Sequence, residues 1–287
     1  MKEKGYRRGG LLYCALSKHK WNNLFNYIFR YRMGHFTLEH GQKVFYWGDV
    51  TKSDALGIFL LSERYGAKIK PNMSFFGIDD YVWLLSKSVS EVVLAETFLY
   101  DAHYIPDLKG KVVVQGGGFT GDTAIYYGKL GAHVYSFEPD YISYNVGLEN
   151  LKLNEVDDVV FDRKALGKDE IIDFYSTGKA NNSKRNNAGS SMKTFSISLK
   201  TLLSNYHIED PYLLDLDIKG SELSFLEDTD SVKKFKWIRI EYQGNLYDIQ
   251  EFFNRIGDFK VERIFKPNEG SYSLANYGVI IYKKKLL

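Results

Sequence analysis

Apolar and polar positions follow two different patterns along the chain, and the change comes near residue 107. From Lys109 onward, short apolar runs typical of buried strands alternate with segments of helical spacing. The runs lie at 111–114, 132–137, 158–161, 212–218, 237–242, 259–265 and 277–282, and the helical segments lie at 121–130, 141–153, 221–228 and 246–256. This alternation predicts an α/β fold with a mostly parallel sheet covered on both faces. The last two runs are too close for a helix between them, which predicts an antiparallel pair.

Residues 1–106 show a mixed pattern. Trp21, Leu24, Phe25 and Ile28 recur at helical spacing, which predicts an amphipathic helix over about 20–32. The other predicted elements are a hairpin at 36–47 that turns at Gly41 and Gln42, a helix at 53–66 and mostly helical structure at 80–103. Because no motif that carries chemistry occurs here, we expect an N-terminal α+β cap, residues 1–106, followed by a cofactor-binding domain, residues 107–287.

One polar segment interrupts the second pattern. Residues 176–193 are basic and rich in Asn, Ser and Gly, a composition typical of a loop or lid. A functional loop and a plain insertion both fit this composition.

The overall composition narrows the class of protein. Hydrophobic residues make up 44% and charged residues 26%, as in ordinary globular domains. The single cysteine, Cys14, excludes an internal disulfide framework and a cysteine-based zinc cluster. No apolar run reaches the length of a transmembrane helix, and the N-terminus lacks a signal-peptide pattern. We therefore expect a cytoplasmic protein.

Charge is distributed unevenly. Residues 1–35 hold one acid, Glu3, and eight basic residues: Lys2, Lys4, Arg7, Arg8, Lys18, Lys20, Arg30 and Arg32. The segment is therefore +7, and since the whole chain is +2 the remainder is −5. A basic, aromatic segment suits nucleic acid or an anionic membrane surface, and it also suits a solvated helix or a partner-binding arm. A membrane-peripheral location stays open on this ground.

A glycine-rich turn follows the first strand of the second domain. Gly116, Gly118 and Gly121 match the pattern G-x-G-x-x-G between a strand and a helix. Glycine allows a tight turn and a close approach to the backbone, and the helix N-terminus offers free N–H groups. Glu138 ends the next strand, 22 residues after Gly116. An acid there can accept hydrogen bonds from both ribose hydroxyls of an adenosine, so an adenosine-containing cofactor is expected, either S-adenosylmethionine or a nicotinamide dinucleotide.

Beyond the turn, several blocks in order resemble the FkbM-type methyltransferases. The blocks are GGFTGDTAIYY, FEPDYISYNVGLENLKLN, KALG at 164–167, FSISLKTLL at 195–203, LLDLDIKGSE at 213–222 and IRIEYQG at 238–244. They span about 111–282, while residues 1–106 show no such resemblance. The resemblance implies a Rossmann-like class I methyltransferase sheet of seven strands with an antiparallel last strand. It also implies S-adenosylmethionine as methyl donor and a hydroxyl acceptor on a sugar, glycolipid or small molecule.

The resemblance also implies roles for individual residues. Residues expected to bind the donor are Gln115, Gly116, Gly117, Gly118, Asp122, Glu138, Asp140, Ala165, Leu166 and Asp217. Glu138 would hold the ribose, Asp140, Ala165 and Leu166 would lie near the adenine, and Asp217 would lie near the methyl group. Three positions depart from the family. Gln115 stands where the family has an acid, Lys219 where it has Glu, and Gln243 where it has His.

A hydroxyl acceptor benefits from a base within hydrogen-bond reach. Asp217 and Glu241 are the candidates because both lie near the carboxyl ends of strands, with Lys219 as an orienting cation. For Glu222, a structural role in the first turn of a helix is favoured over catalysis. His103, His133 and His207 are expected to be surface or packed residues. No ligand spacing supports a metal site.

Three alternatives remain at this point. The basic N-terminal segment and the loop at 176–193 could hold phosphates in a nucleic-acid methyltransferase. The glycine pattern also fits an NAD-dependent oxidoreductase. The departures at Gln115, Lys219 and Gln243 fit a protein that has kept the fold and lost catalysis.

Overall fold

The computed structural model describes the C-terminal part of the chain almost continuously. The described residues are 14–39, 41, 43–46, 52, 55–56, 59, 68–69, 75–78, 81–84, 97, 102–176, 190–218, 221–243, 246–265 and 277–285. The chain divides into two compact units. One unit consists of Ala102–Pro267 with Asn276–Leu287, and the other consists of Met1–Asp101 with Asn268–Ala275.

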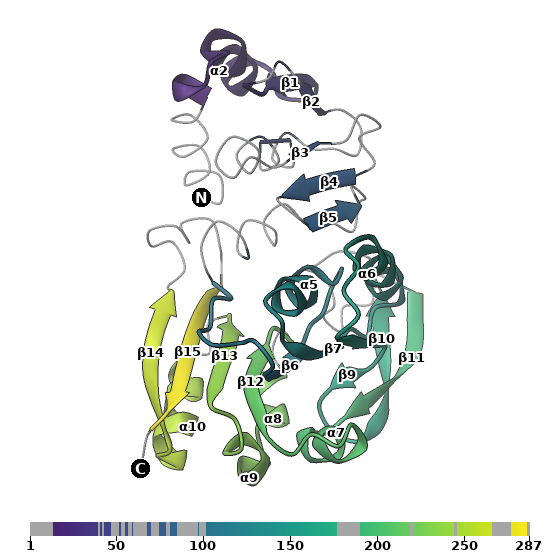
Figure 1. Ribbon diagram of the computed structural model, residues 1–287, viewed down its shortest axis with the longest axis vertical. Helices are drawn as coiled ribbons and strands as arrows, with labels where there is room; N and C mark the ends of the chain where they lie inside the picture. The colour runs from purple at the N-terminus through teal and green to yellow at the C-terminus, as the bar shows by residue number, and fades with distance from the viewer. Residues whose placement is uncertain are drawn as a thin grey trace. The chain divides into compact units, whose positions relative to one another are not determined.

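A seven-stranded sheet forms the centre of the larger unit (Figure 1). Its strands are β6 (Val112–Gly116), β7 (His133–Phe137), β8 (Val159–Asp162), β12 (Pro211–Leu216), β13 (Trp237–Tyr242), β14 (Phe259–Phe265) and β15 (Gly278–Lys284). They are arranged in the order β14-β15-β13-β12-β6-β7-β8. All seven strands expected from the apolar runs are present, with ends shifted by at most two residues.

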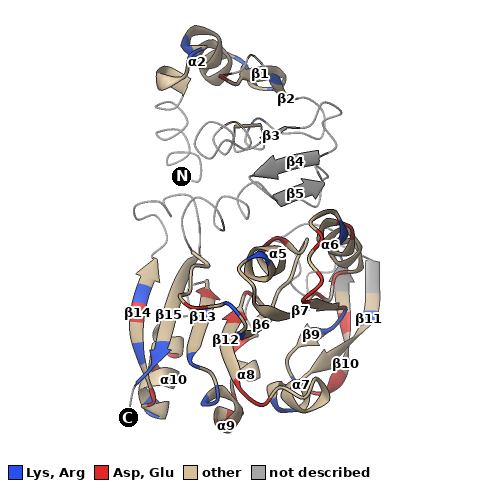
Figure 2. Cartoon of the chain, viewed as in Figure 1, with Lys and Arg blue, Asp and Glu red and all other residues tan. Residues whose placement is uncertain are grey.

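The direction of the strands confirms the predicted α/β sheet. Strands β13, β12, β6, β7 and β8 run parallel to one another, and β15 runs antiparallel to both β13 and β14. The antiparallel pair expected from the last two apolar runs is therefore confirmed. The outermost strand β14 carries Lys260, Glu262 and Arg263 (Figure 2). Such charges keep an edge strand from pairing with another chain.

One face of this sheet is covered by the main apolar core. Its strand residues include Val114, Phe137, Leu214, Ile238 and Ile280. Opposing side chains come from α7 (Leu199–Asn205), α8 (Glu222–Phe225), α9 (Thr229–Val232) and α10 (Leu246–Ile256). Because side chains alternate across a strand, the residues next in sequence lie on the opposite face. That face receives α5 (Asp122–Lys129), whose Tyr127 is fully buried.

The chain between β8 and β12 forms a second small sheet that the apolar runs did not predict. β9 (Ala165–Leu166), β10 (Glu170–Ser176) and β11 (Ser190–Ile197) are arranged in the order β10-β11-β9. The loop predicted for 176–193 is therefore wrong at both ends, because Ser176 and residues 190–193 pair as strand. Residues 177–189 lie outside the described residues. Polar alternation masks a strand when only one of its faces is buried.

The smaller unit contains α2 (Lys20–Phe29) and the antiparallel pair β1 (Gly34–Thr37) and β2 (Lys43–Tyr46), as predicted for 20–32 and 36–47. A three-stranded sheet was not predicted: β3 (Lys68–Ile69), β4 (Phe75–Ile78) and β5 (Tyr81–Leu84). The helical expectation for 80–103 is wrong at β5. Most of the helix expected at 53–66 lies outside the described residues. Among the described helices, none is long and apolar enough to cross a membrane.

Candidate functional site

The polar residues of the larger unit lie on the face of the sheet that receives α5. Ser136, Gln115, Asp215 and Arg239 are register partners on four neighbouring strands, so they form one row across the sheet. Two residues further along each chain stand Glu138, Gly117, Asp217 and Glu241. These four come at or just after the carboxyl ends of their strands. The register thus gathers three carboxylates around the glycine-rich turn at the edge where such sheets bind ligands.

The glycines of the turn make room for the protein itself. Gly117 has φ +82°, and a Cβ there would lie 2.1 Å from the Asp217 backbone oxygen. A Cβ on Gly116 would lie 2.5 Å from Leu166 Cδ1, and one on Gly118 would lie 2.5 Å from Ser136 Oγ. All three distances are shorter than packed atoms allow. The turn therefore packs directly against the backbone that carries Asp217.

Glu138 fixes the shape of the turn through its carboxylate. Glu138 Oε2 accepts a hydrogen bond of 2.8 Å from the Phe119 amide, and Oε1 accepts one of 2.7 Å from the Asp140 amide. Despite these donors, burial raises the pKa of Glu138 to about 8, and the negative charges of Asp140 and Asp217 add to the rise. The group is a buried acid in a negative field.

Asp122 begins α5 and is also buried. Burial raises its pKa to about 7, and the charges of Asp217 and Asp215 raise it further, while Thr123 Oγ1 donates a hydrogen bond of 3.1 Å to it. A carboxylate at a helix N-terminus interacts favourably with the helix dipole. Here the same carboxylate takes the place where a dinucleotide fold would hold a pyrophosphate.

Asp217 and Glu241 are brought together by the sheet. Leu216 and Ile240 are register partners, and the next residues are Asp217 and Glu241. The Asp217 amide donates a hydrogen bond of 3.0 Å to the Gly116 oxygen, which continues the ladder beyond the strand. Asp217 Oδ1 is buried and has no hydrogen-bond partner in the structure, although buried polar atoms normally have one.

The remaining residues expected around the donor have structural partners. Asp140 is the N-cap of α6 (Tyr141–Leu153) and accepts from the Ile142 and Ser143 amides at 2.8 and 3.0 Å. Ala165 and Leu166 are buried in β9, with Leu166 beside Gly116. Gln115 accepts a hydrogen bond of 2.8 Å from Ser136 Oγ. Glu222 is buried at the start of α8.

Lys219 lies outside the described residues, so its expected role as an orienting cation stays a prediction. Gln243 follows β13 and is described. Within the described parts of the chain, no group of three His, Cys, Asp or Glu residues is placed to hold a metal ion.

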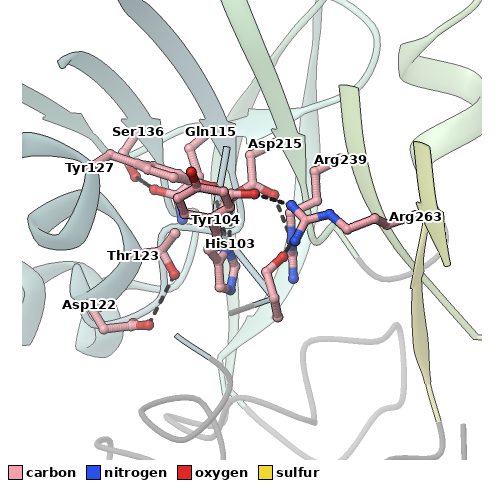
Figure 3. Close-up of polar contacts among 11 residues, drawn as sticks. His103, Tyr104, Gln115, Asp122, Thr123, Tyr127, Ser136, Asp215, Arg239 and Arg263 are labelled. Carbon is pink, nitrogen blue, oxygen red and sulfur yellow. Dashed lines mark hydrogen bonds and ion pairs between the residues drawn. The ribbon is translucent and has the colours of Figure 1, made fainter. Parts of the chain in front are cut away.

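A buried network that the sequence did not reveal is centred on Asp215 (Figure 3). Arg239 Nη1 donates to Asp215 Oδ1 at 2.7 Å, and Tyr127 Oη donates to Oδ2 at 2.8 Å. His103 Nδ1 lies 3.2 Å from Oδ2. Arg239 is fully buried and also donates to the Ala102 oxygen at 2.8 Å. The network therefore attaches the chain before β6 to the face of the sheet.

The charges of this network are mutually supported. Burial alone would raise the pKa of Asp215, but Arg239 and His103 hold it below its ordinary value. Burial and Arg239 lower the pKa of His103, so its imidazole is neutral at physiological pH. The only sequence signals were a charged residue inside each of two apolar strands, Asp215 and Arg239, which is typical of a buried pair. The expectation that His103 is packed is confirmed.

Comparison with known families decides between the two cofactor classes. The profile of the methyltransferase FkbM domain matches residues 114–265, which is more than half of the chain. The chain belongs to the FkbM methyltransferase family. This FkbM protein is therefore an S-adenosylmethionine-dependent methyltransferase, and its sheet is the class I methyltransferase sheet that the resemblance implied.

Solved structures similar to the FkbM protein are also methyltransferases. One is magnesium protoporphyrin IX methyltransferase from Synechocystis PCC 6803 with bound SAM, 12% identical, covering 68% of this chain and 81% of that one, with a TM-score of 0.45. Another is precorrin-6y C5,15-methyltransferase from Geobacter metallireducens, 13% identical, covering 65% and 86%, with a TM-score of 0.42. A third is ribosomal protein L11 methylase from Lactobacillus delbrueckii subsp. bulgaricus, 14% identical, covering 69% and 81%, with a TM-score of 0.42. No curated protein sequence matches the chain.

Proposed function

We propose that this FkbM methyltransferase methylates a hydroxyl group on a sugar, glycolipid or small molecule, and that it does so at the carboxyl edge of β6, β7, β12 and β13. The observation that carries the proposal is the carboxylate cluster of Asp122, Glu138 and Asp217 around the glycine turn. The cluster holds excess negative charge in a buried place. A cationic ligand is what such a place favours.

The methyl donor fits this cluster by charge. S-adenosylmethionine carries a sulfonium and an ammonium, and it supplies the methyl group on the sulfonium. The negative field that raises the pKa values of Asp122 and Glu138 would be relieved by these cations. A pyrophosphate would instead meet carboxylates of its own sign.

Residue roles follow from position. Gly116, Gly117, Gly118 and Gln115 would border the methionine part, and Glu138 would accept from the ribose hydroxyls with the lone pairs that its two amide donors leave. Asp140, Ala165 and Leu166 would lie near the adenine. These assignments rest on the order of the elements together with the contacts of Glu138 and Leu166.

Asp217 and Glu241 would serve the acceptor. Either carboxylate can accept the proton of an acceptor hydroxyl, which makes its oxygen a better nucleophile. Asp217 is the stronger candidate because its buried Oδ1 has no partner in the structure. Lys219 stays a candidate for orienting the acceptor. The division into a cap, residues 1–106, and a methyltransferase domain, residues 107–287, also stays a prediction, as does the cytoplasmic location.

The acceptor class is tested by following S-adenosylhomocysteine formation by mass spectrometry. Panels of sugars, glycolipids, small hydroxyl compounds and RNA would be compared with the wild type, Asp217→Asn, Glu241→Gln and the exposed control Asp158→Asn. We expect turnover with a hydroxyl compound and a loss of about 100-fold or more in Asp217→Asn, since removing a general base costs that much. Turnover with RNA alone would support the nucleic-acid alternative, and no turnover with any acceptor would support lost catalysis.

A further inference from the structure

Helix α2 is turned in the opposite sense to an ordinary amphipathic helix. Its asparagines face the protein: Asn23 is fully buried and Asn26 nearly so. Its aromatic and aliphatic side chains face outward, with Trp21 at 78% and Phe29 at 68% exposure. Phe25 and Ile28 are about half exposed on the same side. Single exposed apolar residues are common, but a whole helix face of them marks an interaction site.

Hydrogen bonds hold the helix in this orientation. Asn23 Nδ2 donates to the Thr37 oxygen at 2.8 Å and to Ser17 Oγ at 2.9 Å, and its Oδ1 accepts from the Thr37 amide at 2.7 Å. Asn22 donates to Thr37 Oγ1 at 2.8 Å. The amide face is thus committed to strand β1, which leaves the apolar face to meet something else.

Basic residues flank the apolar face at both ends. Lys18 and Lys20 come just before Trp21, and Arg30 and Arg32 come just after Phe29; all four are exposed. No Asp or Glu occurs from residue 4 to residue 38. Figure 2 shows the same absence of acidic residues on α2. Leu16, Tyr31 and Met33, each more than 60% exposed, extend the apolar surface beyond the helix.

We propose that this surface, residues 16–33, binds the interface of an anionic lipid membrane with α2 lying parallel to the bilayer plane. Apolar residues on one side would enter the boundary between headgroups and acyl chains, while Lys and Arg would reach the anionic headgroups. Trp21 and Tyr31 belong to the side-chain types that prefer this boundary. This inference goes beyond the methyltransferase activity and does not depend on it.

The charges argue against the two other occupants. A second copy of the chain would bring four cations and no acid against the same set, and like charges facing each other oppose association. Nucleic acid is bound through cations at the centre of an interface, whereas here aliphatic side chains such as Leu16, Ile28 and Met33 are part of the exposed surface. A lipid interface takes both parts of the surface at once.

The test is sedimentation of the full chain with vesicles of phosphatidylcholine alone and with added phosphatidylglycerol. The variant Trp21→Ser/Phe29→Ser removes exposed apolar area, and Ile171→Ser/Phe195→Ser removes equally exposed apolar residues from the larger unit as a matched control. The variant Lys20→Ser/Arg32→Ser tests charge against Lys109→Ser/Lys152→Ser, which changes exposed lysines elsewhere.

We expect the wild type to bind the anionic vesicles and release from them at high salt. The Trp21→Ser/Phe29→Ser variant should bind at least about tenfold more weakly, since each apolar side chain that leaves water contributes that much, while both control variants bind as the wild type does. Equal binding to neutral and anionic vesicles, no binding at all, or equal losses in variant and control would overturn the proposal. RNA binding or dimerisation that Trp21→Ser/Phe29→Ser abolishes, without vesicle binding, would also overturn it.

A second readout separates insertion from nonspecific adsorption. Phosphatidylcholine brominated on its acyl chains quenches a tryptophan that enters the boundary region. Trp21 is one of four tryptophans. We expect quenching in the wild type and its loss in Trp21→Phe, which keeps the apolar surface and so continues to bind. Unchanged quenching in Trp21→Phe would show that another part of the chain meets the lipid.

Discussion

Asp215 holds a buried negative charge that Arg239, Tyr127 and His103 share. Removing one partner of a buried ion pair is far more costly than removing an exposed one, because the remaining charge stays buried without compensation. Asp215→Ala is therefore expected to lower the free energy of unfolding by about 3–5 kcal/mol in urea denaturation. The exposed Asp158→Asn, which breaks a contact to His133, should change it by less than about 1 kcal/mol. Similar effects of the two substitutions would contradict the network.

The glycine turn offers a second test at single residues. Gly117 and Gly110 both have positive φ, but a Cβ on Gly110 meets nothing within 4 Å, whereas one on Gly117 meets the Asp217 oxygen at 2.1 Å. Gly110→Ala should cost only the conformational term, about 1–2 kcal/mol. Gly117→Ala should cost about 1–3 kcal/mol more, since the backbone of Asp217 has to move. Chemical denaturation of both variants measures the difference, and equal costs would show that the turn is not packed against Asp217.

The elements differ in how well the sequence predicted them. Strands buried on both faces, such as β12 and β13, form continuous apolar runs and were found within two residues of their ends. β10 and β11 carry exposed residues such as Ile171 and Phe195 between polar ones, and the polar alternation hid them. The helix α2 was predicted from its apolar spacing, but the same spacing suggested the wrong buried face. The three asparagines, each able to bond the neighbouring strand, decide that face instead.

The asparagine side of α2 gives a prediction about the element. Asn23→Ala removes three hydrogen bonds to residues 17 and 37 and leaves the Thr37 amide buried. We expect the smaller unit to lose about 2–4 kcal/mol of stability. Hydrogen exchange of the Thr37 amide should accelerate accordingly. Asn145→Ala, which removes one bond to the Tyr141 oxygen, is the control and should leave this exchange unchanged.

On the scale of the whole molecule, the carboxylate cluster makes stability depend on pH. The folded-state pKa values of Glu138 and Asp122 lie above their ordinary values of 4.5 and 3.8, so the folded protein keeps protons that the unfolded chain releases. Stability contributed by each group falls as pH rises toward its folded pKa, by about 1.4 kcal/mol per pH unit. His103 has the opposite effect, but only below its ordinary value of 6.5.

Between pH 6.5 and 8 the melting temperature of the ligand-free protein is therefore expected to fall, first through both acids and above pH 7 through Glu138 alone. Thermal unfolding followed by circular dichroism across this range measures the slope. Glu138→Gln should flatten it, while the exposed Glu149→Gln should not. A melting temperature that rises through this range would contradict the raised pKa values.

The sequence predicted the main sheet, the family and the positions of Glu138, Asp217 and Glu241 at its carboxyl edge. It could not predict their electrostatics, because the raised pKa values arise from burial and from neighbours distant in sequence. The Asp215 network depends on contacts across more than one hundred residues, such as His103 with Asp215. Strand ends can be predicted from local pattern, but side-chain partners across a sheet depend on register.

The central claim is that the carboxylate cluster binds S-adenosylmethionine, and isothermal titration with S-adenosylhomocysteine and with NAD tests it most directly. The wild type should bind S-adenosylhomocysteine and show no heat with NAD at the same concentration. Glu138→Gln should weaken binding by about 10- to 100-fold, as expected for a lost charged hydrogen-bond acceptor, and Glu149→Gln should leave it unchanged. Binding of NAD as tight as that of S-adenosylhomocysteine, or equal affinities in the two variants, would contradict the claim.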